Sequence, residues 1–256
     1  MRVLTWNVKT GGSGGRLDGI LAVLRRARPD LLALQELRGF DKDGQTLMRR
    51  VAAGLGMEAQ LSRSVFGQPV AVLVRPPLRI VRRDAVRWRL HHAAAAATIA
   101  TAAGPLTFVS THLNPFAPYR RMREATWLAA RYRTPLTLLA GDLNGLSPLE
   151  DHTASLATLD ARYRRRHLAA DGTADTRGLA AFEAGGLHDR WPAVGVGDGR
   201  TVPTSAGSGA EFGPMRLDYL LASPGLAGHV RELRVVRGDE TEWASDHYPL
   251  SAELTI

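Results

Sequence analysis

The chain has 256 residues, of which 45% are hydrophobic, so it can bury a substantial core. It contains no cysteine, which excludes disulfides, thiolate metal sites and cysteine nucleophiles and leaves oxygen or imidazole ligands for any metal. The 33 basic and 25 acidic residues give a formal net charge of +8, which suits a polyanionic partner. An arginine bias from a GC-rich genome would produce the same excess.

The first residues predict a strand at once rather than a leader segment, and no apolar run approaches transmembrane length. We therefore expect a soluble cytoplasmic protein that does not insert into a membrane, although a mature form that had lost its leader would look the same. No linker or charge block divides the chain, so we expect one domain over residues 1–256, and a monomer.

Short apolar runs alternate with amphipathic segments in the first half. They predict strands at residues 2–8, 29–37, 69–75 and 78–88 and helices at residues 17–27 and 44–56. The alanine run at 93–97 has helix propensity, yet Gly104 and Pro105 form a turn signal between two strand-like runs. Segment 93–111 is therefore predicted to be a hairpin.

The second half continues the mixture of helices and strands. The pattern predicts a helix at residues 119–133, a strand at 135–145, a loop-rich stretch to about Arg216, and strands at 216–223, 229–238 and 248–256. Strands and helices mixed in both halves, with hairpins among them, predict an α/β sandwich of two mostly antiparallel sheets covered by helices.

Polar residues gather at or near the ends of these strands. A single Asn or Asp there is usually a turn residue, and a single His is usually structural. Asp218 differs, because a carboxylate inside an apolar run is costly to bury without a partner. The full set is Asn7, Glu36, His112, Asp142, Asn144, Asp218, Asp246 and His247.

Taken together, these residue types fit the handling of phosphate. Carboxylate and amide oxygens suit a hard cation such as Mg²⁺ or Mn²⁺, which can bridge to phosphate oxygens. Imidazoles and amide N–H groups suit the non-bridging oxygens, where charge grows in the transition state. Residues two apart in an extended chain point the same way, so Asp142 and Asn144 are predicted to converge on one phosphate.

The ordered motifs WN, QE, THLN, GDLN, LDY and SDH run from Asn7 to His247. This series resembles the endonuclease/exonuclease/phosphatase superfamily, which includes pancreatic-type deoxyribonucleases, AP endonucleases and inositol polyphosphate 5-phosphatases. The resemblance implies a four-layer, DNase I-like α/β sandwich that forms a single catalytic domain. It also implies hydrolysis of a phosphoester by in-line attack of water, with one or two Mg²⁺ or Mn²⁺ ions.

The resemblance also implies roles for the motif residues. Glu36 would be the principal metal ligand, with Asn7 and Asp246 completing the metal site directly or through water. Asp142 would orient and deprotonate the attacking water, while Asn144 would donate to the phosphate or hold Asp142.

The two imidazoles would then contact the phosphate. His247 would bind the scissile phosphate with its other nitrogen held by Asp218, which supplies the partner that this buried acid requires. His112 would either stabilise charge or protonate the leaving group.

One departure from the superfamily bears on substrate and metal count. AP endonucleases carry an acid two residues after the first Asn, where this chain has Lys9 followed by TGGSGG. This argues against an abasic-site enzyme and against a second metal near Asn7. The glycine loop is either a phosphate-binding loop or a simple mobile turn.

Substrate recognition is expected from three loop segments, 114–123, 161–178 and 203–216. The candidate substrate-binding residues are Lys9, Asn114, Arg120, Arg123 and Arg216, with Arg164, Arg165 and Arg166 as further phosphate contacts and Tyr119, Tyr163 and Phe212 as stacking residues. The alternative is that these arginines are solvated helix faces and the aromatics pack inward. The six other histidines are predicted to be structural or surface residues.

The sequence therefore predicts a Mg²⁺- or Mn²⁺-dependent hydrolase of ester bonds, with a nuclease acting on DNA or RNA as the leading hypothesis. The alternative is a phosphatase or phosphodiesterase for a small-molecule or lipid-derived phosphoester. A third hypothesis is a non-catalytic binding protein on the same scaffold.

Overall fold

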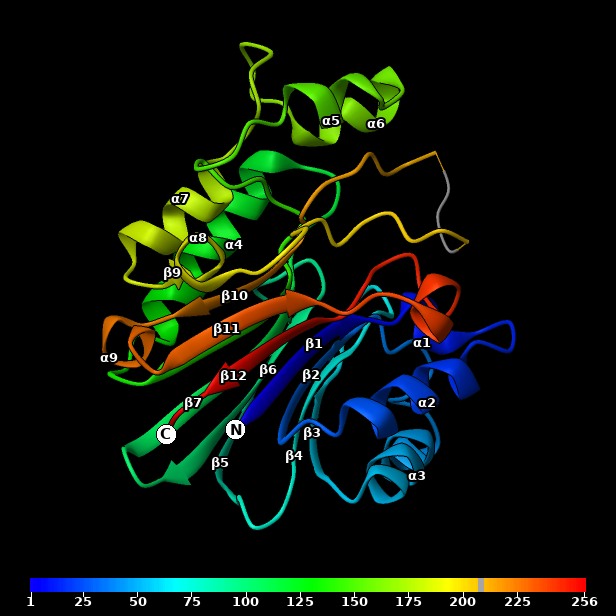
Figure 1. Cartoon of the computed structure of the whole chain (residues 1–256), viewed down its shortest axis with the longest axis vertical. Coiled ribbons are helices and arrows are strands. Elements are labelled where there is room, and N and C mark those ends of the chain that lie inside the picture. The colour runs from blue at the N-terminus through cyan, green and yellow to red at the C-terminus, as the bar shows by residue number, and fades with distance from the viewer. Residues whose placement is uncertain (207–209) are drawn as a thin grey trace.

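The computed structural model describes residues 1–206 and 210–256 and contains two six-stranded sheets packed face to face, with helices on the outside (Figure 1). The strand order is β11-β12-β1-β2-β4-β3 in the first sheet and β5-β6-β7-β8-β10-β9 in the second. Neighbouring strands are antiparallel except in the pairs β1/β2 and β7/β8, which are parallel. The predicted sandwich of two mostly antiparallel sheets is confirmed.

The bounds of the elements are as follows. The first sheet contains β1 (Arg2–Asn7), β2 (Leu31–Gln35), β3 (Glu58–Ser62), β4 (Val70–Val74), β11 (Val230–Val235) and β12 (Leu250–Leu254). The second contains β5 (Ile80–Val86), β6 (Ala93–Thr101), β7 (Gly104–His112), β8 (Thr137–Asp142), β9 (His188–Asp189) and β10 (Asp218–Ala222). The longer helices are α2 (Leu17–Ala27), α3 (Thr46–Leu55), α4 (Pro118–Arg131) and α7 (Arg177–Ala184). The shorter ones are α1 (Lys9–Gly12), α5 (Thr153–Ala157), α6 (Ala161–Arg164), α8 (Trp191–Val194) and α9 (Pro224–Ala227), with 3₁₀ turns η1 (Asp43–Gln45), η2 (Arg165–His167) and η3 (Asp239–Glu242).

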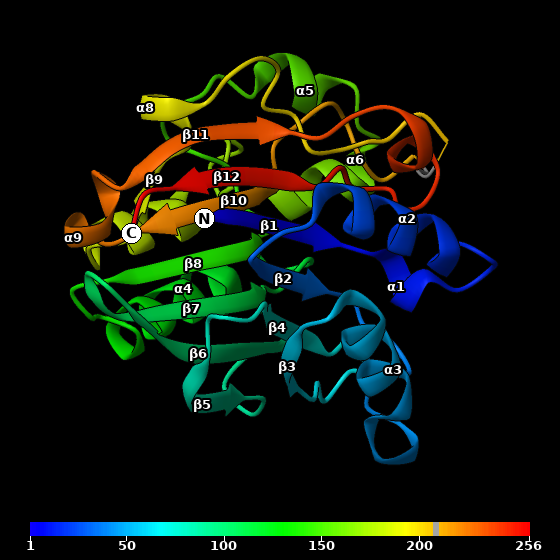
Figure 2. The same cartoon turned by 60° about the horizontal axis from the view of Figure 1, so that its bottom comes forward.

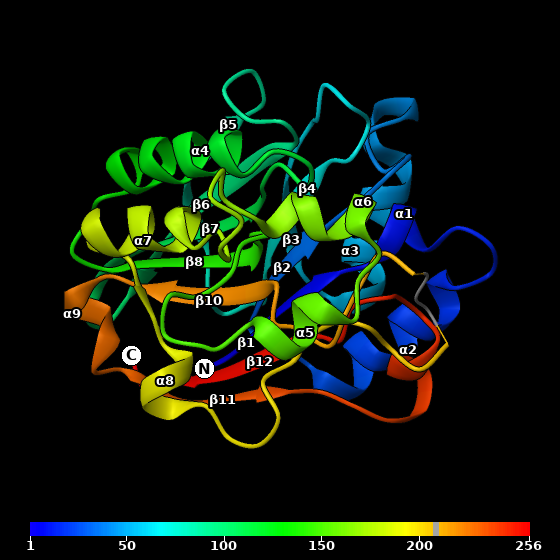
Figure 3. The same ribbon diagram turned by 90° about the horizontal axis from the view of Figure 1, so that it is seen from above.

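Three apolar layers hold the four structural layers together. Strand residues alternate between the two faces of a sheet, so Val3 and Leu31 pack between the sheets while Leu4 and Leu32 pack under α2 and α3. The second sheet has a corresponding outer layer under α4 and α7, which lie side by side on its outer face (Figure 3).

The alanine-rich segment forms a hairpin, as its turn signal predicts. β6 pairs with β7 in an unbroken register from Ala93 opposite His112 to Thr101 opposite Gly104. Residues Ala93 to Ala97 are all almost fully buried, because one face of β6 meets the first sheet and the other meets the α4 layer. Tertiary packing between two layers therefore outweighs the helix propensity of alanine.

Other boundaries differ from the prediction. β3 was not predicted, and the strand expected at 78–88 ends at Val86, which leaves residues 87–92 as a loop. The stretch expected to be loop up to Arg216 contains α5 to α8, η2 and β9. Residues 207–209 of the predicted recognition segment 203–216 lie outside the described residues. No helix of the described ranges is long and apolar enough to cross a membrane.

The topology brings several strand ends to one edge of the sandwich. The parallel registers place Asn7 opposite Gln35 and His112 opposite Asp142, so β1, β2, β7 and β8 all end at that edge (Figure 2). Antiparallel pairing places Asp218, the first residue of β10, opposite Asp142 as well. The polar residues at the strand ends are thereby collected at one place.

Candidate active site

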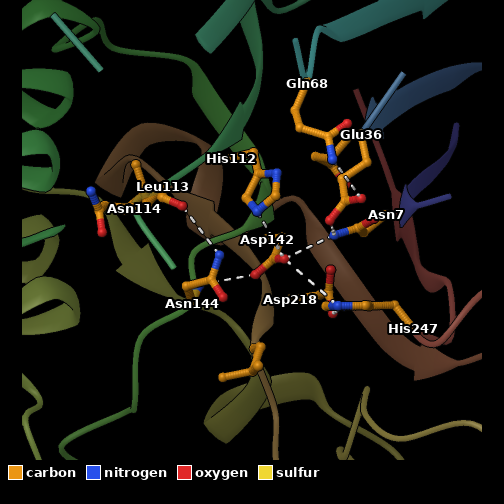
Figure 4. Close-up of polar contacts among 12 residues, drawn as sticks. Asn7, Glu36, Gln68, His112, Leu113, Asn114, Asp142, Asn144, Asp218 and His247 are labelled. Atoms are coloured by element: carbon orange, nitrogen blue, oxygen red, sulfur yellow. Dashed lines mark hydrogen bonds and ion pairs between the residues drawn. The ribbon is translucent and has the colours of Figure 1, made fainter. Parts of the chain in front are cut away.

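Asp142 lies at the centre of the polar cluster, at the end of β8 (Figure 4). One carboxylate oxygen, Oδ2, accepts a hydrogen bond from Asn7 Nδ2 at 3.0 Å and lies 3.3 Å from His112 Nε2 and 3.7 Å from His247 Nε2. Its side chain is only 2% exposed. Asn7, His112 and His247, all predicted site residues, therefore lie within 4 Å of Asp142.

The glycine before Asp142 is required by close backbone approach. Gly141 has φ of 150°, and a Cβ atom placed on it would lie 2.0 Å from the carbonyl oxygen of Thr111 on β7. Any side chain here would force apart the two parallel strands that carry His112 and Asp142.

Asn144 reaches Asp142 through a turn and not through the alternation of a strand. β8 ends at Asp142, and Asn144 has a left-handed backbone with φ of 49°. Its backbone N–H donates to Asp142 Oδ1 at 2.9 Å, and its side-chain Nδ2 donates to the carbonyl of Leu113 at 3.1 Å. The predicted convergence on the same side of an extended strand is thus corrected: the turn brings the two residues together, and Asn144 holds Asp142.

His247 and Asp218 form a buried ion pair beside Asp142. His247 Nδ1 lies 2.8 Å from Asp218 Oδ2, and Asp218 is fully buried. Burial by itself would lower the pKa of His247, but the carboxylates of Asp218 and Asp142 outweigh it and raise the pKa to about 10. The imidazole is therefore charged at neutral pH, with Nε2 directed toward Asp142.

The same neighbours act on Asp142 itself. Burial raises the pKa of the Asp142 carboxyl to about 7, because the repulsion from Asp218 adds to the burial effect and the charge of His247 only partly offsets it. A carboxylate with a pKa near neutrality is suited to accept a proton from a water molecule.

By donor type and spacing, Asp142, Asp218 and His247 could also hold a metal ion, since ligand atoms of the three lie within 4.8 Å of one another. However, His247 is itself the cation between the two carboxylates. A metal bound at Nε2 would have to replace the proton on that nitrogen, while Nδ1 could keep its 2.8 Å contact with Asp218. The cluster is better described as an acid, imidazolium and acid arrangement.

Glu36 follows β2 and is held by donors on three sides. Its Oε1 accepts a hydrogen bond from Asn7 Nδ2 at 3.1 Å, and its Oε2 accepts from the Thr10 N–H at 2.9 Å and Gln68 Nε2 at 3.1 Å. The backbone φ of Glu36 is 58°, an uncommon value for a residue with a long side chain. Gln68, on the loop between β3 and β4, was not predicted.

Lys9 lies on the Asp246 side of the site. Its ammonium is 2.9 Å from Asp246 Oδ2, and its backbone N–H donates to Asn7 Oδ1 at 3.0 Å. The position that would carry an acid in AP endonucleases thus supplies a fixed positive charge to Asp246.

The glycine loop that follows Lys9 supports Glu36. The Thr10 N–H binds the Glu36 carboxylate, and the Gly11 N–H donates to the Glu36 carbonyl at 2.6 Å. Gly11 has φ of 68°, and a Cβ there would lie 2.4 Å from the carbonyl oxygen of Arg38. These two N–H groups are bound to Glu36, so they are not free to cradle a phosphate. Gly14 and Gly15, further along the loop, are exposed.

His112 is supported by a histidine that the sequence prediction left as structural. The ring of His92 stacks on that of His112 with centroids 4.1 Å apart, and both residues are buried. Burial lowers the pKa of His92 to about 3 and lowers that of His112 well below its usual value. Both rings are therefore neutral at neutral pH.

The predicted substrate-binding residues separate into two groups. Arg216 is buried and pairs with Asp189 at 2.7 Å and with Glu150, so the prediction that it binds substrate is replaced by a structural role. Asn114 is also buried, and its Oδ1 accepts the N–H groups of Phe116 and Ala117 at the start of α4. These two hydrogen bonds hold the loop at the start of α4, so the Asn114 side chain does not face solvent.

Arg120 and Arg123, in contrast, are exposed on α4 and line an open pocket beside the site. Phe212 places its ring edge-on to His247, with centroids 5.3 Å apart. These three remain available for substrate contacts.

Two facing mixed sheets with acids, amides and imidazoles at one edge define a DNase I-like α/β sandwich protein. The model of the Endonuclease/Exonuclease/phosphatase family matches residues 4–247, and the chain belongs to this family. Members of the family are hydrolases that act on phosphoester bonds. A search of curated protein sequences gives no match.

Solved structures with the same fold come from several organisms. An AP endonuclease from Archaeoglobus fulgidus is 19% identical with a TM-score of 0.75, over 100% of both chains. A mannosyl-6-phosphatase from Bacteroides thetaiotaomicron VPI-5482 is 16% identical with a TM-score of 0.70, over 100% of both chains. Truncated TDP2 from Caenorhabditis elegans is 16% identical with a TM-score of 0.68, over 100% of this chain and 97% of that one. At these identities the likeness shows the fold.

Proposed function

We propose that this chain is a divalent-metal-dependent phosphodiesterase, and that its substrate is DNA or RNA. The observation that supports this most directly is the centre itself: Asp142 accepts a hydrogen bond from Asn7 and lies within 4 Å of His112 and of the charged His247. A general base and a fixed positive charge side by side are what the attack of water on a phosphodiester requires.

The pKa shifts distinguish the roles of the two histidines. The charged His247, held by Asp218, would stabilise the negative charge that grows on the non-bridging phosphate oxygens. His112 is neutral because burial lowers its pKa, so it carries no additional proton to give to a leaving group. Of the two roles expected for His112, stabilising charge at the phosphate is therefore better supported than protonating the leaving group.

The donors on the other side of Asp142 fit a hard cation. Glu36 and Asp246 offer carboxylate oxygens and Asn7 an amide oxygen, the set that suits Mg²⁺ or Mn²⁺. The contacts of Thr10 and Gln68 fix the Glu36 carboxylate, as supporting residues do for metal ligands. When bound, the ion would neutralise phosphate charge. Lys9 already places a positive charge on Asp246, which favours one metal ion over two.

Hydrolysis of bis-p-nitrophenyl phosphate, with and without Mg²⁺ or Mn²⁺, tests the reaction class. We expect metal-dependent hydrolysis, and a loss of more than about a hundredfold in Asp142→Asn and in His247→Ala, since each change removes a proton-accepting or charge-stabilising group. The exposed Asp43→Asn variant, which has the same change of charge as Asp142→Asn and lies outside the three candidate recognition segments, should keep full activity. Unchanged hydrolysis in Asp142→Asn would instead show that the hydrolysis does not arise at this centre, and would favour a non-catalytic protein.

A metal titration tests the ligand assignment separately. Glu36→Gln should raise the Mg²⁺ concentration needed for half-maximal activity by about tenfold or more, because it removes a charged ligand. Glu253→Gln, at the partly exposed Arg2 pair in the other part of the first sheet, should leave the titration unchanged. Equal metal affinity in wild type and Glu36→Gln would contradict the assignment.

The nuclease hypothesis has its own test. If plasmid DNA and single-stranded RNA both survive while bis-p-nitrophenyl phosphate is cleaved, the substrate is a small-molecule or lipid-derived phosphoester. That outcome would bring the chain closer in function to the structural neighbour named as a mannosyl-6-phosphatase.

A further inference from the structure

An open pocket of about 460 Å³ is lined in part by His91, whose ring contacts His92, the histidine that stacks on His112. It lies where the loops after β5 and β7 and the start of α4 meet, and its lining includes Phe66, Trp88 and His91 together with Arg89, Arg120 and Arg123. A second pocket of about 280 Å³ is lined by Phe116, Tyr163 and three arginines of the segment 162–166. Aromatic and arginine side chains thus make up most of both walls.

Four rings lie along these pockets, and we call them the aromatic ridge: Phe66, His91, Phe116 and Tyr163. Phe66 stacks on His91 with centroids 4.4 Å apart, and His91 meets the edge of Phe116 at 5.6 Å. The guanidinium of Arg166 lies over both Phe116 and Tyr163, at 5.3 and 4.8 Å.

Much of this aromatic surface is open to solvent. Phe66 is 59% exposed and Phe116 is 56% exposed, and the neighbouring Trp88 is 74% exposed. Clusters of exposed rings are typical of ligand-binding or interaction surfaces, whereas single exposed rings are common on any protein.

The ridge leads directly to the catalytic centre. The ring of His91 lies 4.5 Å from that of His92, which stacks on His112, whose Nε2 is 3.3 Å from Asp142. The ridge is therefore joined to the candidate active site by the contacts of His91, His92 and His112, and a single strand bound at both places would run from Asp142 toward these rings.

Two buried charged residues of α4 hold the ridge in place. Arg121 donates to the carbonyls of Asn114 and Arg166, at 2.8 and 2.7 Å. Glu124, one turn further, accepts the N–H groups of His91 and Asn114, at 2.6 and 2.8 Å. Three loops are thereby fixed to one helix, so the ridge is formed before any ligand arrives.

The charges around the ridge select an anion. Among the described residues, Arg89, Arg120 and Arg123 form no salt bridge, whereas Arg131 and Arg216 are paired with acids. The single acid in the pocket lining, Glu124, turns both oxygens to backbone N–H groups. Unpaired arginines beside exposed rings match a chain of phosphates that carries flat bases.

We infer that the aromatic ridge is a base-stacking site for single-stranded nucleic acid, on which unpaired bases stack while Arg89, Arg120 and Arg123 contact the phosphates. The inference rests on the proposed phosphodiesterase function and names its substrate class. A duplex keeps its bases stacked on one another, so it would use the arginines but not the rings.

Binding of short labelled oligonucleotides in EDTA tests this without requiring activity. Fluorescence anisotropy would compare a single-stranded thymidine oligomer, the corresponding duplex, and an oligomer of the same length whose residues carry no base. We expect the base-bearing single strand to bind roughly fivefold to a hundredfold more tightly than the base-free one. Equal affinity for these two oligomers in the wild-type protein would overturn the inference, with no variant needed.

Matched variants then locate the contact. Phe66→Leu and Phe116→Leu keep apolar bulk but remove the ring, and should weaken binding of the base-bearing strand by about fivefold or more while leaving the base-free strand unchanged. Phe66→Tyr and Phe116→Tyr keep the ring and should bind as wild type. Arg120→Gln should weaken both strands, whereas Arg79→Gln, an exposed arginine just before β5, should weaken neither.

The two possible failures can be told apart. Leu variants that bind single strands as tightly as wild type would overturn the ridge as a stacking site, whatever the activity. If wild type also fails to cleave bis-p-nitrophenyl phosphate with Mg²⁺ or Mn²⁺, the proposed function fails. Normal cleavage of that small ester by the Leu variants, with slower cleavage of single-stranded oligonucleotides, would support both.

Discussion

His247 keeps its proton in a buried place because two carboxylates offset the cost of desolvating the charge. Asp218 holds one ring nitrogen at 2.8 Å, and Asp142 lies near the other. The pair is also an orientation device, because a hydrogen bond at Nδ1 fixes which nitrogen points to the reacting centre.

This arrangement predicts a pH dependence of stability. The folded pKa of His247, about 10, lies above its ordinary value of 6.5, so the pair contributes stability that is complete below about pH 6.5 and lost as pH rises through about 10. Asp218→Asn removes the attraction that raises this pKa, so the variant should be less stable near neutral pH and lose less on going to pH 10. Urea unfolding followed by circular dichroism between about pH 7 and pH 10 would measure this.

That window also separates His247 from Asp142. Because the pKa of Asp142 is raised to about 7 in the folded protein, its contribution to stability decreases as pH rises from about 4 to about 7. That range lies below the one used for His247. The exposed Asp43→Asn variant is a control for the loss of one carboxylate. A variant Asp218→Asn with the pH dependence of wild type would show that another group holds the proton on His247.

Residues at strand ends could be predicted because their place depends on the chain alone. His112, Asp142 and Asp218 each follow or begin an apolar run, and the sheet registers bring them together. Residues that reach the site from a distant loop leave no such signal. Gln68 and His92 are of that kind, and each contacts a motif residue from a segment that has no motif of its own.

Arg216 shows the opposite error. Its position beside Asp218 suggested a phosphate contact, but its guanidinium is taken by Asp189 and Glu150. Pairing of this kind depends on residues 27 and 66 positions away, so no local pattern distinguishes a structural arginine from one that binds substrate.

At the scale of elements, the parallel contact of β7 and β8 determines the geometry of the centre. These strands carry His112 and Asp142 in register, and Gly141 allows them to approach. Short apolar runs, together with the turn signal at Gly104 and Pro105, predicted both strands. Their neighbours in the sheet depended on contacts that no single segment reveals.

Gly141→Ala should therefore damage both stability and activity. The added methyl group would meet the Thr111 carbonyl at 2.0 Å in a backbone conformation that alanine rarely adopts, which we expect to cost more than about 2 kcal/mol. Thermal unfolding would measure the loss. Gly228→Ala, where a Cβ would meet nothing within 4 Å, is the matched control and should change the melting temperature little. Equal melting temperatures for the two variants would contradict the proposed role of Gly141.

Loops and short helices were the least predictable elements. Residues 87 and 88 were assigned to the end of a strand, yet they begin the loop 87–92, which carries Trp88 and His91 into the pocket. Apolar and aromatic residues that favour strands can also occur in a loop. Here the strand is distinguished from the loop only by its pairing with β6, which ends at Val86.

At the scale of the whole molecule, the sandwich followed from the mixture of strands and helices, but its closure did not. β1 pairs with β12, so Arg2 lies opposite Glu253 in the centre of the first sheet. Contacts between the two ends of a chain have no local sequence signature. The number of layers could be predicted, whereas the strand order could not.

The net charge of +8 leads to a prediction about salt. If the substrate is a polyanionic strand, its binding releases counterions, and the logarithm of affinity should fall with the logarithm of salt concentration with a slope of about −0.7 per phosphate contact. Raising the NaCl concentration should therefore increase the KM for a single-stranded oligonucleotide and so slow its hydrolysis. Bis-p-nitrophenyl phosphate, with one charge, should show little change. Steady-state kinetics over a range of NaCl concentrations would measure both substrates. The same dependence of KM on salt for the two would exclude binding of several phosphates.

The buried guanidinium of Arg121 limits how the loops beside the candidate active site can be exchanged. Because it binds the carbonyls of Asn114 and Arg166, two loops far apart in sequence share one anchor on α4. A transplanted segment in place of residues 161–167 would need a carbonyl at the position of Arg166, or it would leave a buried charge short of a partner. Recognition loops on this scaffold are therefore not independent modules, and successful exchanges should be those that transfer both loops with their supporting helix.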